Sequence, residues 1–137
     1  MAAILLGLLS ACACLAAAPA VPNPSFEKGA RGAPAGWTLS GGNGSWLSGG
    51  AASGTRFVAV CGSGSDTNYW RAPLAGLEPA RLYGVSFRAR GRGLAGGAAV
   101  TGPDFCNRDI GHPPADWREY SSVFMTPRGY ADGAGWL

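Results

Sequence analysis

The residues best suited to chemistry in this chain are aromatic side chains with polar neighbours. Trp46 lies in a run of glycine and serine, where we expect an exposed loop. Tyr69 and Trp70 directly follow Asn68, and as neighbours on a strand only one of the two is expected to pack inward; the sequence leaves open which one. An aromatic ring can stack on the apolar face of a pyranose ring, while planar polar groups bind the sugar hydroxyls. We expect Trp46 and Tyr69 to act as such platforms. The hydrogen-bonding partners that we expect beside them are Arg71, Arg88 and Asp109.

The same sequence offers little for catalysis. It has no Gly-x-Ser-x-Gly turn and no phosphate-binding loop, and its one histidine, His112, lies between a glycine and a proline. Asp104, Asp109 and Asp116 fall within one connecting segment, where aspartates are commonly solvated. Nucleophilic and two-carboxylate mechanisms need partners that this pattern does not supply. We therefore expect a protein that is not an enzyme, and a small esterase or hydrolase is the least favoured alternative.

The first 20 residues have the pattern of an export signal. They carry no charge, contain the apolar run Ile4–Leu9 and end in Ala18-Pro19-Ala20, a small-x-small cleavage pattern. The run is short and rich in alanine, so we expect no membrane span. The sequence predicts cleavage after Ala20 and a secreted, periplasmic or cell-surface protein. A lipoprotein that carries its lipid on Cys12 is the alternative.

Export determines how the cysteines are interpreted. Cys12 and Cys14 belong to the leader, which leaves Cys61 and Cys106 in the mature chain. In an oxidising compartment two cysteines predict one disulfide. By closing the loop between them it would lower the chain entropy of the unfolded state, which stabilises the folded protein by roughly 4 kcal/mol. Two free thiols are the alternative.

Composition indicates the kind of fold that must hold these residues. The chain has 137 residues, enough for one domain, with 23 glycines and 10 prolines spread between short apolar runs. No helical periodicity follows Val21, so we expect an all-β domain over residues 21–137. The basic residues behind the net charge of +3 are scattered along the chain, which argues against a nucleic-acid partner.

One stretch organises the expected sheet. From Leu82 to Arg90 the residues alternate, with Tyr83, Val85 and Phe87 on one side and Arg88 on the other. Because successive side chains of a strand point to opposite faces, this is a half-buried strand. Further strands are expected at residues 55–61, as a central strand, and at 68–72, 98–101 and 117–125, and residues 135–137 resemble the opening of another.

The order of several motifs resembles a known superfamily. They are Asn23-Pro24-Ser25-Phe26-Glu27, Pro34-Ala35-Gly36-Trp37, the segment from Gly76 to Arg90, and Trp117-Arg118-Glu119-Tyr120 with Phe124. Together they are similar to the galactose-binding-like β-sandwich superfamily of carbohydrate-binding modules, as appended to bacterial glycoside hydrolases. The resemblance implies an antiparallel jelly-roll β-sandwich, and we expect this chain to lack its last strand.

The resemblance also implies a function and a metal. It predicts a non-catalytic carbohydrate-binding module of an exported bacterial protein, which tethers a downstream catalytic domain to a polysaccharide or oligosaccharide. In related modules the glutamate at the position of Glu27 helps to bind a structural calcium ion, which needs six to eight oxygen ligands. A structural or adhesive β-sandwich of a secreted or surface protein is the alternative function.

Overall fold

Strands and loops make up the whole of what the computed structural model describes, namely residues 19–92, 98–135 and 137. All strands in this part are antiparallel, and they form five two-stranded sheets. The expected all-β class is confirmed. Within the described residues there is no helix with the length and apolar character needed to cross a membrane. The predicted leader, residues 1–20, lies almost entirely outside them.

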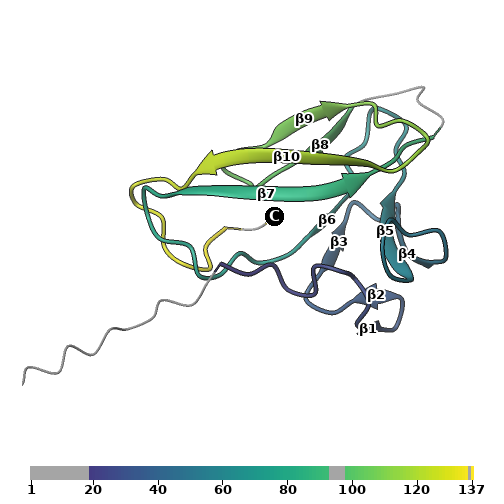
Figure 1. Ribbon diagram of the computed structural model, residues 1–137, viewed down its shortest axis with the longest axis horizontal. Helices are drawn as coiled ribbons and strands as arrows, with labels where there is room; N and C mark the ends of the chain where they lie inside the picture. Colours follow the sequence, from purple (N-terminus) through teal and green to yellow (C-terminus); the bar gives the residue numbers. More distant parts are fainter. Residues whose placement is uncertain (1–18, 93–97, 136) are drawn as a thin grey trace, which may run out of the picture.

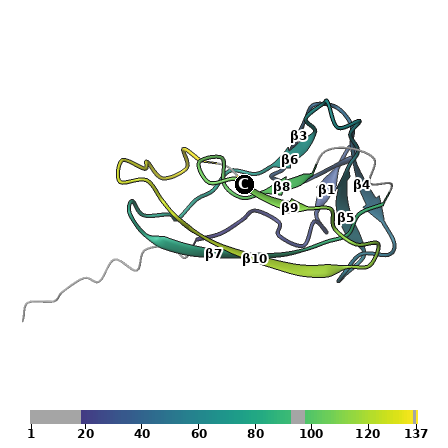
Figure 2. The same ribbon diagram turned by 90° about the horizontal axis from the view of Figure 1, so that it is seen from above.

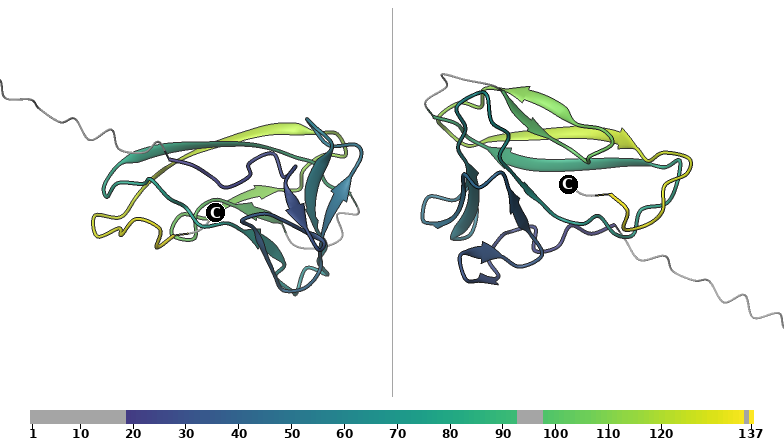
Figure 3. Two further views of the ribbon diagram at one scale, coloured as in Figure 1. Left: turned by 90° about the horizontal axis from the view of Figure 1, so that it is seen from below. Right: turned by 180° about the vertical axis from the view of Figure 1, so that it is seen from behind.

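The longest sheet joins β7 (Leu82–Ala89) to β10 (Arg118–Met125), which run side by side in Figure 1. Their register pairs Leu82 with Met125 and Arg88 with Glu119. Exposure alternates along β7, with Tyr83 and its odd-numbered successors half-buried and Arg88 exposed, as the sequence predicted. Figures 2 and 3 show the other described strands mainly on one side of this ribbon, and apart from the contact of Arg88 with Ala52 we refer to its opposite side, among the described residues, as the open face.

The other sheets are short and lie beside the inner face of this ribbon or near its end. They are β1 (Gly29–Ala30) with β2 (Ala33–Pro34), β3 (Thr38–Ser40) with β6 (Tyr69–Arg71), β4 (Gly44–Ser48) with β5 (Arg56–Val60), and β8 (Ala99–Thr101) with β9 (Arg108–Gly111).

The expectation of a central strand at residues 55–61 is wrong. Among the described residues β5 pairs with β4 alone. Aromatic rings pack against part of β5 where a second neighbouring strand would otherwise lie, and Val60 at its end is exposed. Phe57 packs edge-on against Trp117, with ring centroids 5.6 Å apart, and Trp70 donates a hydrogen bond to the backbone of Ala59.

The main hydrophobic cluster lies under the β10 end of the ribbon. It comprises Leu74, Leu77, Phe124 and Tyr130. The ring of Phe105 packs edge-on against Phe124 and Tyr130, at centroid distances of 5.8 and 5.6 Å. Burial of such aromatic side chains contributes most of the stabilisation in a small domain.

The last residues pair with the segment that follows β6. Leu137 and Ala72 exchange two backbone hydrogen bonds of 2.8 and 2.9 Å, and Leu74 donates to Gly135 at 3.0 Å. Reciprocal bonds of this kind are those of an antiparallel strand pair. This pairing agrees with the strand opening that the sequence suggested for residues 135–137.

Candidate functional site

Trp46 is part of strand β4 and not of an exposed loop, which corrects the expectation from its glycine and serine neighbours. It lies opposite Val58 in the β4–β5 register and is half-buried. Its indole N–H donates to the Phe26 carbonyl at 2.8 Å. A Cβ placed on Gly29 would lie 2.6 Å from the edge of the ring. The indole is therefore held in one orientation.

A cation covers one face of the Trp46 ring. The guanidinium carbon of Arg56 lies 4.0 Å from the ring centroid, which is a cation–π arrangement. Arg56 faces Ser48 in the register, so it is the diagonal cross-strand neighbour of Trp46. Sequence reasoning did not single out Arg56, because the diagonal contact follows only from the pairing of β4 with β5.

The carboxylate of Glu27 fastens the N-terminal segment to the same hairpin. It accepts hydrogen bonds from the Thr55 hydroxyl at 2.5 Å, the Thr55 N–H at 2.8 Å and the Arg56 N–H at 2.9 Å. These bonds, led by the one from the Thr55 hydroxyl, lower the pKa of Glu27, because they favour the ionised form. A side chain at Gly54 would collide with the carboxylate.

These surroundings do not resemble a calcium site. The groups that contact the Glu27 carboxylate are N–H and O–H donors, and amide nitrogens do not bind calcium. Among the described residues no three His, Cys, Asp or Glu side chains gather where they could hold a metal ion. The calcium ion expected at Glu27 stays a prediction, and the observed contacts give this residue a structural role.

Arg88 reaches the loop at the tip of the β4–β5 hairpin. Its guanidinium donates to the Ala52 carbonyl at 3.4 Å and lies 3.7 Å from the carboxylate of Glu119, its cross-strand partner. Its side chain leaves the ribbon on the face opposite Tyr83, as the alternation predicted. Arg88 and Trp46 thus belong to the same end of the molecule.

A second arginine at this tip is packed between aromatic rings. The guanidinium carbon of Arg90 lies 4.8 Å from the Trp117 centroid and 5.3 Å from that of Phe57. The indole N–H of Trp117 donates to the Gly50 carbonyl at 2.9 Å. The hairpin tip is therefore bound both to the end of β7 and to the start of β10.

Tyr69 and Arg71 lie on the opposite side of β6 from Trp70. The Trp70 indole donates to the Ala59 carbonyl at 3.1 Å, so Trp70 packs against the β4–β5 hairpin. Because alternate residues of a strand face opposite sides, Tyr69 and Arg71 point away from that hairpin. The sequence left open which of Tyr69 and Trp70 packs inward, and the structure assigns this position to Trp70.

Asp109 lies on another sheet again. It is exposed on β9, and its carboxylate accepts the N–H of Gly111 at 2.6 Å. The five residues expected to bind sugar thus belong to four different sheets. Trp46 belongs to the β4–β5 hairpin and Arg88 contacts its tip, so that hairpin is the candidate site.

The predicted disulfide between Cys61 and Cys106 is wrong for this structure, in which both cysteines are free. Cys61 is exposed after β5, and its N–H donates to the Asn43 carbonyl at 2.9 Å. Cys106 is half-buried against the main hydrophobic cluster, and its N–H donates to the Pro103 carbonyl at 2.7 Å. Cys61 lies beside the β4–β5 hairpin and Cys106 beside the main hydrophobic cluster, so the two thiols belong to different parts of the fold.

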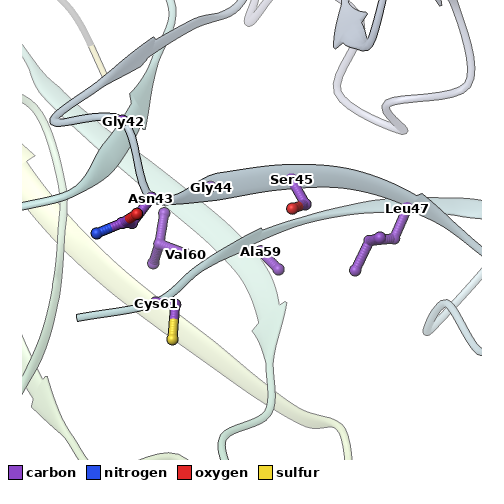
Figure 4. A pocket seen from close by; sticks show the side chains of 8 residues that line it. All are labelled: Gly42, Asn43, Gly44, Ser45, Leu47, Ala59, Val60 and Cys61. Carbon is purple, nitrogen blue, oxygen red and sulfur yellow. The ribbon is translucent and has the colours of Figure 1, made fainter. Parts of the chain in front are cut away.

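A shallow open hollow of about 280 Å³ lies beside the start of β4. Figure 4 shows its lining, which includes the side chains of Asn43, Ser45, Leu47 and Cys61. A polar loop borders it, where Asp66 accepts bonds from the Ser63 hydroxyl and N–H, each at 2.6 Å, which lower the pKa of Asp66. None of the residues expected to bind sugar lines this hollow.

Comparison of the chain with family models, curated proteins and solved structures found no match. The candidate function therefore rests on the residues of the β4–β5 hairpin and on the motifs in the sequence.

Proposed function

We propose that this chain is a non-catalytic carbohydrate-binding domain of an exported protein, with the strands of a jelly-roll β-sandwich. The antiparallel all-β architecture and the ordered motifs along the chain support the fold. A polysaccharide or oligosaccharide is the ligand, and a catalytic domain in the same protein is the partner that such a module tethers.

The observation that carries the proposal is the fixed indole of Trp46. The ring is held by the Phe26 carbonyl, keeps part of its surface exposed, and has the donors of Arg56 beside it. Carbohydrate sites combine a rigid aromatic surface with a few well-placed polar groups, because both reduce the entropy lost on binding. The five residues that the sequence predicted to bind sugar lie on four different sheets. We therefore assign the proposed sugar site to Trp46 and Arg88.

The test is retention by polysaccharides. Purified protein is run in native gels that contain a neutral galactan, a xylan or an acidic polysaccharide, beside bovine serum albumin as a non-binding reference. We expect slower migration in at least one polysaccharide gel, and less slowing when the matching free oligosaccharide is added. Unchanged migration in every gel contradicts the proposal.

A second function is favoured by the open face of the β7–β10 ribbon. Leu82, Val123 and Met125 are 71%, 59% and 60% exposed there, although their side chains are apolar. Neighbouring exposed apolar side chains often mark a surface that contacts another protein. The chain is then a structural or adhesive domain. Light scattering, which measures self-association, distinguishes the two functions. Adhesion is supported if the protein self-associates, if Val123→Asp abolishes this self-association, and if no polysaccharide retains the protein.

A further inference from the structure

Two arginines at the hairpin tip have their guanidinium groups close to aromatic rings. The guanidinium carbon of Arg56 lies 4.0 Å from the Trp46 centroid, and that of Arg90 lies 4.8 Å from the Trp117 centroid. A cation–π contact does not neutralise the charge of a guanidinium group, and its N–H groups can still donate hydrogen bonds to an acceptor. The contact with a ring limits where each guanidinium group can lie.

Neither guanidinium has a carboxylate partner. All eight acidic residues belong to the part of the chain that the structure describes, and the ion pairs found there are Arg81–Glu78 and Arg88–Glu119. In the same part no side-chain hydrogen bond from Arg56 or Arg90 is observed. Glu27 acts on Arg56 at longer range, and its carboxylate already accepts three hydrogen bonds.

The two groups border one loop, residues 49–55. Arg56 begins the strand that leaves this loop, and the guanidinium of Arg90 lies 3.6 Å from the position that a Cβ on Gly50 would occupy. Arg88 donates to Ala52 in the same loop. Arg56 and Phe57 point to opposite faces of β5, and Arg90 contacts Phe57, so cationic side chains lie on both faces of the tip. The net charge of the protein is +3.

We propose that the hairpin tip binds anionic groups of a polysaccharide, with Arg56 and Arg90 as the residues that recognise a carboxylate or sulfate. This inference rests on the proposed function, because it names the chemical class of the sugar ligand. Charge-assisted bonds from a guanidinium to an oxyanion are short and strong, and bidentate geometry adds specificity. The rings of Trp46 and Trp117 lie beside the two guanidinium groups.

The experiment measures affinity in native gels that contain polygalacturonate, a sulfated galactan or a neutral galactan. We expect the acidic polymers to bind more tightly than the neutral one, and the affinity to fall as salt is raised. The carboxylated and sulfated polymers show which oxyanion is preferred. Single-stranded DNA is the competing polyanion, and displacement of the protein by DNA at equal charge concentration overturns the assignment to a sugar.

Variants of the two arginines test the residues themselves. Arg56→Gln and Arg90→Gln are each expected to weaken binding to the acidic polymer roughly tenfold, as for loss of a charge-assisted contact. Arg81→Gln removes the same charge at an exposed position paired with Glu78, so it serves as the control and leaves affinity unchanged. Arg56→Lys keeps the charge without the planar donors and is expected to restore only part of the affinity.

The outcomes separate this inference from the proposed function. Equal retention by neutral and acidic polymers, or no loss in folded Arg56→Gln and Arg90→Gln, overturns the inference and leaves carbohydrate binding intact. The inference is also overturned if Arg81→Gln weakens binding as much as Arg56→Gln and Arg90→Gln do, because the loss of net charge then accounts for the effect. Retention by none of these polymers, and by no xylan gel either, overturns both.

Discussion

Glu27 binds Thr55 twice, through the hydroxyl at 2.5 Å and through the backbone N–H at 2.8 Å. The two residues are 28 positions apart in the sequence. This contact joins the segment that supplies the Phe26 carbonyl to the hairpin that carries Trp46 and Arg56. The orientation of the candidate site therefore depends on a carboxylate outside it.

Replacing that carboxylate is expected to lower stability in a pH-dependent way. Folding lowers the pKa of Glu27 from its ordinary value of 4.5, so the ionised form stabilises the folded state. This contribution is fully present above pH 4.5 and is lost as the pH falls through the lower folded-state pKa. Thermal unfolding should show Glu27→Gln melting below the wild-type protein at pH 7, with the difference shrinking in strong acid.

Glu119→Gln is the matched control for this prediction. Glu119 is also an exposed glutamate, but its one ion pair, with Arg88, spans 3.7 Å. Exposed pairs of this kind contribute little, so its melting temperature should stay near that of the wild type at both pH values. A Glu27→Gln effect no larger than that of Glu119→Gln argues against the fastening role.

Gly54 is expected to tolerate alanine less well than Gly49. Both have positive φ, at +68° and +83°, where any side chain costs about 1 kcal/mol. An added Cβ at Gly54 also collides with the Glu27 carboxylate, while Gly49 has open space around it. Urea unfolding should therefore give a larger loss for Gly54→Ala. Equal losses in the two variants would mean that the carboxylate does not pack against Gly54.

Adjacent positions on β10 should respond very differently to truncation. Phe124 is 6% exposed in the main cluster, and Val123 is 59% exposed on the open face. Phe124→Ala is expected to cost about 3–5 kcal/mol of unfolding free energy. Val123→Ala should change it by about 0.5 kcal/mol or less. Similar losses in chemical denaturation would show that the register of β10 is wrong.

The alternation of β7 could be predicted from the sequence because one of its faces is buried and the other is open. A period of two in side-chain character then encodes the strand directly. The partner of β7 could not be predicted, since β10 lies far along the chain and pairing depends on the whole fold. The observed register of Arg88 with Glu119 therefore comes from the structure alone.

Trp46 shows where local reasoning fails. The glycine and serine residues on both sides of Trp46 predicted a loop, yet residues 44–48 form a strand that pairs with β5. Tertiary context overrides such local preferences. The prediction of a disulfide failed for a related reason, because the number of cysteines in a sequence does not say where the fold places them.

Thiol reactivity tests directly whether Cys61 and Cys106 are free. Cys61 is exposed and Cys106 is half-buried. In protein that lacks residues 1–20, and with them Cys12 and Cys14, a thiol reagent should modify Cys61 first in the folded state and Cys106 only slowly. Unfolding without reductant should then expose two reactive thiols in all, and Cys61→Ser should remove the fast phase. Absence of any reactive thiol in the unfolded protein would restore the disulfide.

The most direct test of carbohydrate binding at the hairpin is the loss of the Trp46 ring. Trp46→Ala should cost on the order of 1–3 kcal/mol of binding, by analogy with stacking of nucleic-acid bases on aromatic side chains. Trp46→Phe keeps an apolar ring without the bond to Phe26 and should lose less. We expect affinity electrophoresis to show Trp46→Ala retarded less than the wild type by the same polysaccharide, while near-ultraviolet circular dichroism shows a folded protein. Undiminished retention of folded Trp46→Ala would contradict the account.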